Sequence, residues 1–194
     1  VVLFGMDVEG YDVRLPLWQR AKYLNYYYYC SFNKGTFPTE MRRSDVEAAW
    51  RDLDGFVLRL SNLYHVLTLH PKMRSLGHVN QRNEDYYALA TDEIRLVAEV
   101  EHNRWCVERL MMGSRPPTDR EREEIRNNIL SFLDKNDASL PDLKKEYKTK
   151  GVHYDLCAYD ELNIDRTGRN VRVYDLELTA CLPLIVNETK SLLP

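Results

Sequence analysis

The residues with the most chemistry in this sequence stand close together in one stretch, residues 94–113, which reads IRLVAEVEHNRWCVERLMMG. If the stretch is a helix, His102, Asn103, Trp105 and Arg109 lie within two turns of one another. They bring hydrogen-bond donors and acceptors, a flat aromatic surface and a cation to one place. This combination suits a planar anionic ligand, because an aromatic ring stacks on the plane and an arginine pairs with the anion.

Two further residues of the same kinds, His153 and Tyr159, follow downstream and complete the candidate ligand-binding site. The same side chains also suit a buried structural network, because buried polar groups are normally paired with one another. In that interpretation Arg109 forms an ion pair with Glu101 or Glu108. The residues alone leave both interpretations open.

Metal binding and nucleophilic catalysis are weakly supported by the spacing. Glu99-x-x-His102 is one arm of a carboxylate di-iron site, but no second Glu-x-x-His is present, so a hydrogen-bonded Glu99–His102 pair is the simpler expectation. Cys106 follows His102 without a nucleophile elbow, a glycine-rich loop or an evident orienting residue. We therefore expect no metal, no cofactor and no catalytic set. An enzyme would have to use His102 as a general base assisted by Glu99 or Glu101.

The stretch itself is predicted to be a single helix that begins near Thr91 and ends before Gly113, a typical left-handed C-cap. Pro116 and Pro117 forbid its continuation. Apolar residues recur along it at three- and four-residue steps, which is typical of a helix face that packs in a core. This predicted core face consists of Leu96, Val100, Val107, Leu110 and Met111, and it is widened by Val97, Ala98, Trp105 and Met112.

The rest of the chain also predicts mainly helices. One helix begins at Pro16 and ends near Gly35, and a capping box at Ser44 begins a long helix that is bent or broken at Gly55 or at 61–62. A second capping box, Thr118 to Glu121, begins a helix with a thin apolar face. A short helix at 158–162 and a last helix at 176–186 follow. The apolar segment 1–4 could be a strand.

Composition excludes several classes of protein. The net charge is −3, from 27 basic and 30 acidic residues that are mixed along the chain, so no nucleic-acid-binding surface is expected. The apolar runs are too short to span a membrane. The four cysteines show no CxxC spacing, which favours free thiols in a reducing cytoplasm over zinc or disulfides. Because the chain begins with Val1, we expect a piece of a longer protein.

The central stretch resembles the signature helix of the ryanodine-receptor repeat (RyR) domain, LAE…H(N/D)xWxxxR(L/I)xxG. A second family pattern, a Lys followed by HxxLxPYxxL, is matched further along, although Ala158 stands where the family usually has Pro and Ser114 where Trp often follows the Gly. The matching positions are Leu96, Ala98, Glu99, His102, Asn103, Trp105, Arg109, Leu110 and Gly113, and then Lys150, His153, Leu156, Tyr159 and Leu162.

The resemblance implies a mainly α fold, a bundle of paired antiparallel helices with at most a small β-hairpin. It implies an N-terminal helical segment at 1–90 and an RyR domain at 91–190 with an insertion near 119–147. The EHNRW version is similar to bacterial members, in which a TrkA-N-like nucleotide-binding domain often lies upstream; residues 1–5 would be the tail of such a domain.

By analogy with this family, we expect a non-enzymatic binding or regulatory module of a larger cytoplasmic protein, whose ligand is a small nucleotide-derived molecule. Its partners would be that ligand and the upstream domain of the same polypeptide, with no nucleic acid and no membrane span. The alternatives are a structural module that forms a homodimer through its tyrosine-rich helix, Tyr26 to Tyr29, and an enzyme that acts on a nucleotide or phosphodiester.

Overall fold

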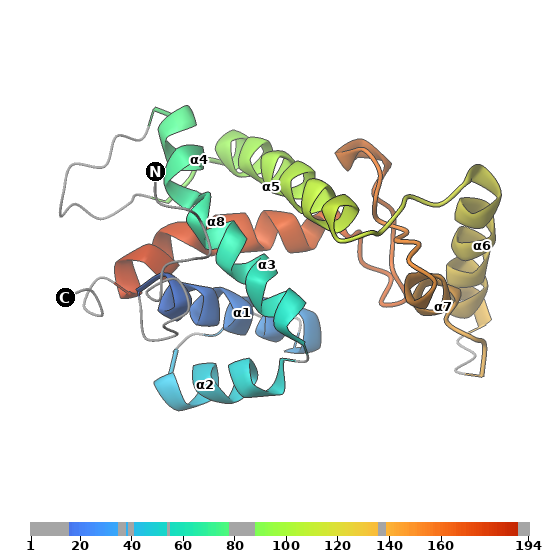
Figure 1. Ribbon diagram of the computed structural model, residues 1–194, viewed down its shortest axis with the longest axis horizontal. Coiled ribbons are helices and arrows are strands. Elements are labelled where there is room, and N and C mark those ends of the chain that lie inside the picture. The colour runs from blue at the N-terminus through green and yellow to red at the C-terminus, as the bar shows by residue number, and fades with distance from the viewer. Residues whose placement is uncertain are drawn as a thin grey trace. The chain divides into compact units, whose positions relative to one another are not determined.

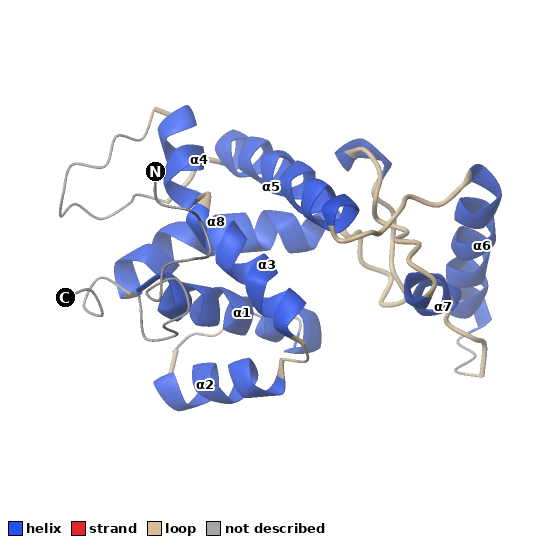
Figure 2. Cartoon of the chain, in the orientation of Figure 1, coloured by secondary structure: helices blue, strands red, loops and turns tan. Residues whose placement is uncertain are grey.

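The protein is mainly helical, as predicted, and the part of it that the computed structural model describes contains no β-strand (Figure 1, Figure 2). The described residues are 16–34, 38, 41–53, 55–77, 88–135 and 139–189, so the strand suggested for residues 1–4 lies outside them. The helices are α1 (Pro16–Lys34), α2 (Arg43–Asp52), α3 (Phe56–Leu67), α4 (Leu69–Ser75), α5 (Thr91–Met111), α6 (Asp119–Lys135), α7 (Leu143–Thr149), the 3₁₀ helix η2 (Tyr159–Glu161) and α8 (Arg172–Glu188).

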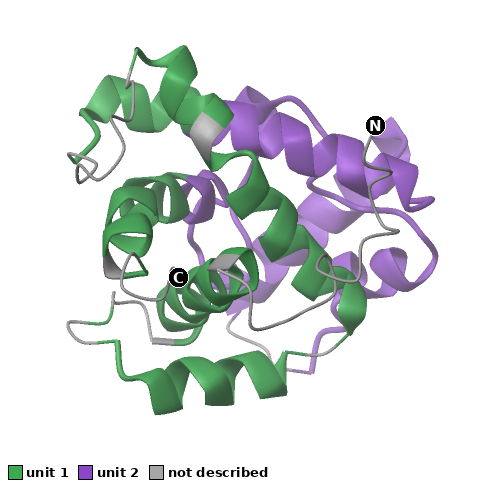
Figure 3. Ribbon diagram, turned by 60° about the vertical axis from the view of Figure 1, so that its left-hand side comes forward, with its two compact units in different colours: residues 1–97, 176–194 green, residues 98–175 purple. Residues whose placement is uncertain are grey.

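The chain forms two compact units, which Figure 3 distinguishes by colour. Unit 1 comprises residues 1–97 and 176–194, and unit 2 comprises residues 98–175. The division falls inside α5 and inside α8. The expected domain boundary near residue 90 and the expected insertion near 119–147 stay predictions, because compactness alone does not define a family domain.

Unit 1 has a conventional apolar core. Helix α1 packs against α2 and α3, and the ring of Trp18 meets that of Trp50 edge-on with centroids 6.1 Å apart. The second part of α8 is tied to α1 by polar contacts as well, since Arg20 Nε donates to Thr189 Oγ1 at 3.0 Å. The largest fully buried apolar side chains of this core are Leu24, Leu69, Met73, Leu182 and Ile185.

Unit 2 has a second, smaller apolar core under α6. Ile125 and Ile129 of α6 are almost completely buried and pack with Tyr154. The predicted capping box begins this helix: Glu121 N donates to Thr118 Oγ1 at 3.3 Å, and Thr118 N donates to Glu121 Oε2 at 2.8 Å. The thin apolar face expected of α6 is therefore the face that it buries.

Local stop and start signals predicted most helix ends. Gly113 has φ 86° and follows α5 as expected, and Gly55, also with φ 86°, separates α2 from α3. The capping box expected at Ser44 is wrong. Helix α2 begins one residue earlier, and its N-cap residue, Arg42, makes no side-chain capping bond.

The predicted core face of α5 is correct only at Val97 and Ala98, which are buried. Leu96, Val100, Val107, Leu110 and Met111 are all exposed. The helix instead buries polar residues, namely Glu101, His102, Glu108 and Arg109. The physical reason is that these residues find partners of opposite charge or hydrogen-bonding capacity within unit 2, which removes most of the penalty of burying them.

Candidate functional site

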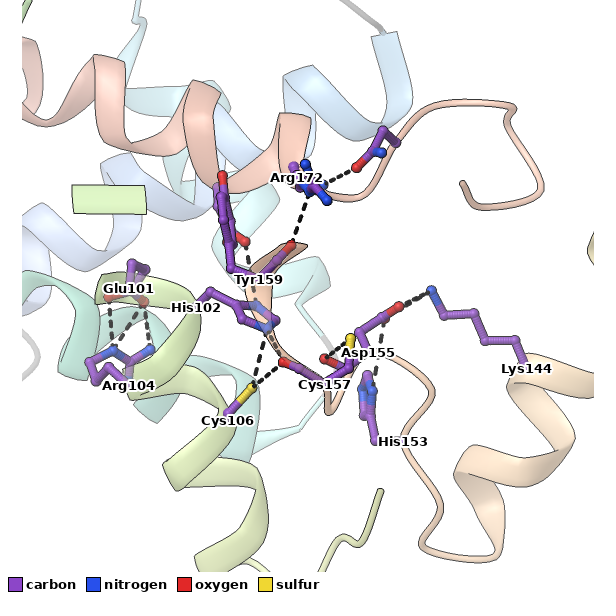
Figure 4. A network of polar contacts seen from close by, with 12 residues as sticks. Glu101, His102, Arg104, Cys106, Lys144, His153, Asp155, Cys157, Tyr159 and Arg172 are labelled. Atoms are coloured by element: carbon purple, nitrogen blue, oxygen red, sulfur yellow. Dashed lines mark hydrogen bonds and ion pairs between the residues drawn. The ribbon is translucent and has the colours of Figure 1, made fainter. Parts of the chain in front are cut away.

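The candidate site lies in unit 2 and is centred on His102, whose surface is only 3% exposed (Figure 4). Its Nε2 atom lies 2.9 Å from the carbonyl oxygen of Cys157, and its Nδ1 atom lies 3.6 Å from Oδ2 of Asp175. A carbonyl oxygen can only accept, so Nε2 carries a proton and donates it. Asp175 offers a second acceptor on the other side of the ring, so both nitrogens are placed to be protonated.

This environment keeps His102 positively charged. Burial by itself would lower the pKa of His102, but the hydrogen bonds to Asp175, Cys106 and the Cys157 carbonyl outweigh it and raise the pKa to about 10. The thiol of Cys106 contributes because its Sγ atom lies 3.3 Å from Nε2. Burial raises the pKa of the Asp175 carboxyl, and the positive charge of His102, whose Nδ1 atom faces it, opposes that rise.

Four rings follow one another through the site. His153 meets Trp105 edge-on with centroids 4.8 Å apart, Trp105 stacks on His102 at 5.8 Å, and the tilted ring of Tyr159 lies 5.7 Å from that of His102. Trp105 and Tyr159 are half-buried, whereas the two histidines are buried. The structure thus brings four residues of the predicted site together.

A cation lies against each of two rings in this row, Trp105 and Tyr159. The guanidinium of Arg109 lies 5.9 Å from the centroid of Trp105, and that of Arg172 lies 5.7 Å from the centroid of Tyr159. Arg172 also donates from Nε to the Tyr159 carbonyl oxygen at 2.9 Å, which attaches η2 to the first turn of α8. Both contacts have the geometry of cation–π interactions.

Charges on α5 neutralise one another beside the rings. Arg104 donates to Glu101 at 2.7 Å and to Glu108 at 2.7 Å. Glu108 also accepts a hydrogen bond from Arg109. Of the two partners considered for Arg109 in the sequence, Glu108 is the one that it contacts, and Glu101 pairs with Arg104 instead. The two glutamates and two arginines give this group no net charge.

His153 is positioned by an isolated bridge between two loops. Arg115 and Val152 pair in parallel, and His153 N donates to the Arg115 carbonyl oxygen at 3.0 Å. The turn before it requires Gly151, whose φ is 76°. Next to it, Asp155 binds Lys144 of α7 at 2.8 Å. Backbone pairing thus fixes the His153 ring against α5.

In contrast to His102, His153 is neutral at physiological pH. Burial lowers its pKa, and the positive charges of Lys148, Lys144 and Arg109 lower it further against the opposing effect of Asp155, so that the pKa is about 4. Nδ1 of His153 lies 3.9 Å from the Asp155 carboxylate, which is too far for a hydrogen bond.

Two buried atoms of this site lack hydrogen-bond partners among the described residues: Nε of Arg109 and Nδ1 of His153. Both residues are 8% exposed, and both lie against the ring of Trp105. An unpaired buried polar atom costs about 1–3 kcal/mol, so such atoms in a folded protein call for an explanation.

The structure places the predicted site residues unevenly. Five of the six lie together, but Asn103 is exposed and takes no part in the contacts around His102. The expected Glu99–His102 pair is wrong, because Glu99 is exposed and His102 pairs with Asp175. The residues that sequence reasoning missed are Lys144, Asp155, Arg172 and Asp175. The sequence pointed to them only through the excess of ionisable residues on α5. That excess predicts that partner residues exist, but it does not identify them.

The remaining chemistry of the described residues is limited. All four cysteines are free thiols; Cys30 and Cys181 are buried, and Cys106 and Cys157 are half-buried. No group of three or more histidine, cysteine, aspartate or glutamate side chains among these residues is arranged to hold a metal ion. Of the helices in the described part, none is long and apolar enough to cross a membrane.

Comparison with known proteins found no relative: no family model, no curated protein and no solved structure matches the chain. The RyR resemblance, which rests on the spacing of residues in α5 and in 150–162, therefore stays a prediction.

Proposed function

We propose that this chain is a non-enzymatic binding and regulatory module of the RyR type, within a larger cytoplasmic protein, and that unit 2 binds a nucleotide-derived ligand. The ligand would be planar and anionic. Its plane would stack on Trp105 or Tyr159, and its anionic group would pair with Arg109. Support for the family comes from the spacing of the matched residues and from a mainly helical fold.

The observation that carries the proposal is the pair of unsatisfied buried atoms beside Trp105. Arg109 Nε is a donor, and neutral His153 carries one nitrogen that accepts and one that donates. Both atoms flank one aromatic ring that is itself only half-buried. A ligand that stacks on this ring and offers an anionic oxygen to Arg109 would satisfy groups that the described protein leaves unpaired.

The charges near His153 favour an anion. Lys148, Lys144 and Arg109 each act to lower its pKa, which means that each contributes positive potential at the ring. Only Asp155, among the groups that act on it, opposes them. Lys144 and Arg109 are each paired with a carboxylate, Asp155 and Glu108, so the exposed Lys148 would be the cation that draws a phosphate or carboxylate to this place.

The geometry argues against His102 as a general base. A histidine with a pKa of about 10 is already protonated at neutral pH and cannot accept another proton. Glu99 is exposed, and Glu101 is occupied by Arg104, so neither carboxylate assists His102. A structural role is the stronger alternative, because the ion pairs of α5 already neutralise its buried charges.

Ligand-dependent thermal stabilisation tests the proposal. The panel would contain AMP, cyclic AMP, ADP-ribose and NAD⁺, with adenosine and inorganic phosphate to separate stacking from anion binding. A ligand that binds only the folded protein raises its melting temperature in proportion to the logarithm of its concentration above Kd. We expect at least one nucleotide to stabilise the wild type, and Trp105→Ala and Arg109→Gln to weaken its binding tenfold or more.

Arg120→Gln is the matched control, since Arg120 is an exposed arginine on α6 in the same unit. It should bind like the wild type. A second readout needs no variant: bound anion should raise the pKa of His153 from about 4, measured by NMR titration. A folded protein that no member of the panel stabilises, with His153 unchanged, contradicts the proposal and leaves the structural role.

A further inference from the structure

Two of the four free thiols lie beside the buried histidine of the candidate site, and the proposed ligand uses neither of them. Cys106 stands one turn after His102 on α5, and Cys157 belongs to the loop whose carbonyl oxygen His102 contacts. Both cysteines are half-buried, and both belong to unit 2. The surroundings of the two sulfurs can therefore be compared within one unit.

The Cys106 sulfur faces a positive charge. Its Sγ atom lies 3.3 Å from Nε2 of His102 and 3.9 Å from the Cys157 carbonyl oxygen (Figure 4). His102 is protonated at neutral pH, because its contacts raise its pKa to about 10, and Cys106 is one of the groups that raise it. A cation next to a cysteine stabilises the thiolate, which is the form that attacks electrophiles. For Cys106 this cation is His102.

The ring that carries this charge is held on its other sides. Nδ1 of His102 faces the Asp175 carboxyl of α8 at 3.6 Å, and the rings of Trp105 and Tyr159 lie 5.8 Å and 5.7 Å from that of His102. Proteins activate a thiol by placing a histidine within reach of the sulfur and a third group behind the histidine. Asp175 is such a third group, and the sequence gave no indication of it.

The Cys157 sulfur has different surroundings. Its Sγ atom donates to the Asp155 carbonyl oxygen at 3.7 Å. Burial raises the pKa of Cys157, against the opposing effect of Arg122. A thiol that stays protonated is a poor nucleophile. Cys157 is thus an internal reference for Cys106, since it is a half-buried thiol of the same unit without an activating histidine at its sulfur.

We propose that Cys106 is a reactive thiol, activated by His102, which low-molecular-weight disulfides modify reversibly. Thiol–disulfide exchange needs a thiolate and access to it. A half-buried sulfur beside a protonated imidazole provides both. His102 is a positioning residue in this reaction, because it acts through the Cys106 sulfur. The inference is independent of the proposed ligand.

The exchange balances without a further reactant. Cys106 releases its proton to solvent, and its thiolate attacks one sulfur of the disulfide. The bond between the two sulfurs of the reagent breaks as the new bond to Cys106 Sγ forms. The departing thiolate takes a proton from solvent. Cys106 is thereby oxidised and the departing thiol is reduced, so an excess of reduced thiol reverses the modification.

The modification should change the charge of the candidate site. The Cys106 sulfur acts to raise the pKa of His102, through its hydrogen bond and through the charge of its thiolate. In a mixed disulfide this sulfur carries neither a proton nor a charge. The adduct should therefore lower the pKa of His102 from about 10.

Rates of modification at each cysteine test the proposal. The full chain would be incubated with hydroxyethyl disulfide, a small neutral probe, and the adducts would be followed by peptide mass spectrometry. We expect Cys106 to react about tenfold or more faster than Cys157. The buried Cys30 and Cys181 should react only after unfolding in urea. Equal rates at Cys106 and Cys157, or a faster Cys157, would overturn the proposal.

Two variants test the role of His102. His102→Gln should lower the rate at Cys106 about tenfold or more and leave the rate at Cys157 within about twofold of the wild type. Cys157→Ser is the matched control, and it should leave the rate at Cys106 unchanged. A Cys106 rate that His102→Gln does not lower would show that His102 does not activate this thiol.

A spectroscopic measurement on the wild type needs no variant to fold. NMR titration should show a lower pKa for His102 in the modified protein than in the unmodified one, and reduction with dithiothreitol should restore the original value. A His102 whose titration the adduct does not move would contradict the contact between the charged ring and the reactive sulfur.

Discussion

Helices α5 and α6 belong to the same unit over most of their length and solve the problem of burial in opposite ways. Helix α6 buries Ile125 and Ile129 and leaves most of its charged residues exposed. Helix α5 buries glutamates, an arginine and His102 besides Val97 and Ala98, and it exposes the apolar residues Val100, Val107 and Leu110. Periodicity finds a helix and its stripes in both cases, but it does not say which stripe faces inward. That depends on what the rest of the unit offers as a partner.

The two arrangements also differ in energy. The apolar face of α6 gains free energy from burial at about 25 cal/mol per Å² removed from water. The polar face of α5 gains little, because the cost of desolvating its ions roughly cancels their attraction, and yet it is costly to break. A helix of this second kind specifies an arrangement of groups more than it stabilises a fold, which agrees with a site.

The largest effect is expected from removing the carboxylate that two arginines share. Glu108→Gln leaves Arg104 and Arg109 buried without their common counter-charge. We expect the free energy of unfolding to fall by about 3–5 kcal/mol, measured by urea denaturation. Glu123→Gln, at an exposed glutamate of α6, is the control and should change it little. Equal losses for the two variants would mean that α5 is not anchored by its polar face.

The next effect concerns the apolar face of α6. Ile129 is 1% exposed, so Ile129→Ala should cost about 2–5 kcal/mol. Its neighbour Leu130 is exposed on another side of the helix. Leu130→Ala should therefore lower the free energy of unfolding by less than about 1 kcal/mol. Denaturation of both variants at the same protein concentration checks the contrast. A reversed order would show that the faces of α6 are assigned wrongly.

A smaller and pH-dependent effect is expected from His102. Its pKa is raised from 6.5 to about 10 in the folded protein, so the folded state holds a proton that the unfolded state releases. The resulting stabilisation is complete below pH 6.5 and is lost as the pH rises towards 10. In urea denaturation, the free energy of unfolding should decline between pH 6 and 9.5. His102→Gln should reduce this decline, and His153→Gln should leave it unchanged. An unchanged slope in His102→Gln would exclude the raised pKa.

The smallest effect is expected on the exposed face of α5. Val107 is 56% exposed, so Val107→Ser should change the free energy of unfolding, measured in dilute solution, by no more than about 0.5 kcal/mol. The comparison with Ile129→Ala isolates the difference between the two helices, since both remove a branched apolar side chain. A loss of several kcal/mol at Val107 in dilute solution would mean that this face packs inside the protein.

These contrasts explain what the sequence could predict. Helix class and most helix ends depend on neighbouring residues, and they were readable: Thr118 with Glu121 begins α6, Gly55 precedes α3 and Gly113 follows α5. The inward face of α5 was not readable. It depends on Asp175 and on the Cys157 carbonyl, which are distant in sequence and carry no motif.

The candidate site divides in the same way. Trp105 and Arg109 lie one turn apart on α5, so their proximity follows from helix geometry alone. His153 and Tyr159 were added to the predicted site by their residue types and by the family resemblance, since spacing along the chain cannot place a loop against a helix. Asn103 was grouped with them by its closeness in sequence, and it lies on the exposed face because it is two residues from Trp105, on another side of the helix.

The orientation of α5 underlies the proposed ligand site, and NMR titration of the histidine side chains tests it most directly. We expect His102 to keep both ring nitrogens protonated from pH 5 to 9 and to titrate only near pH 10, while His153 stays neutral down to about pH 4. If α5 turned its apolar stripe inward, His102 would be exposed. It would then titrate near its ordinary pKa of about 6.5, and this result would contradict the buried polar face.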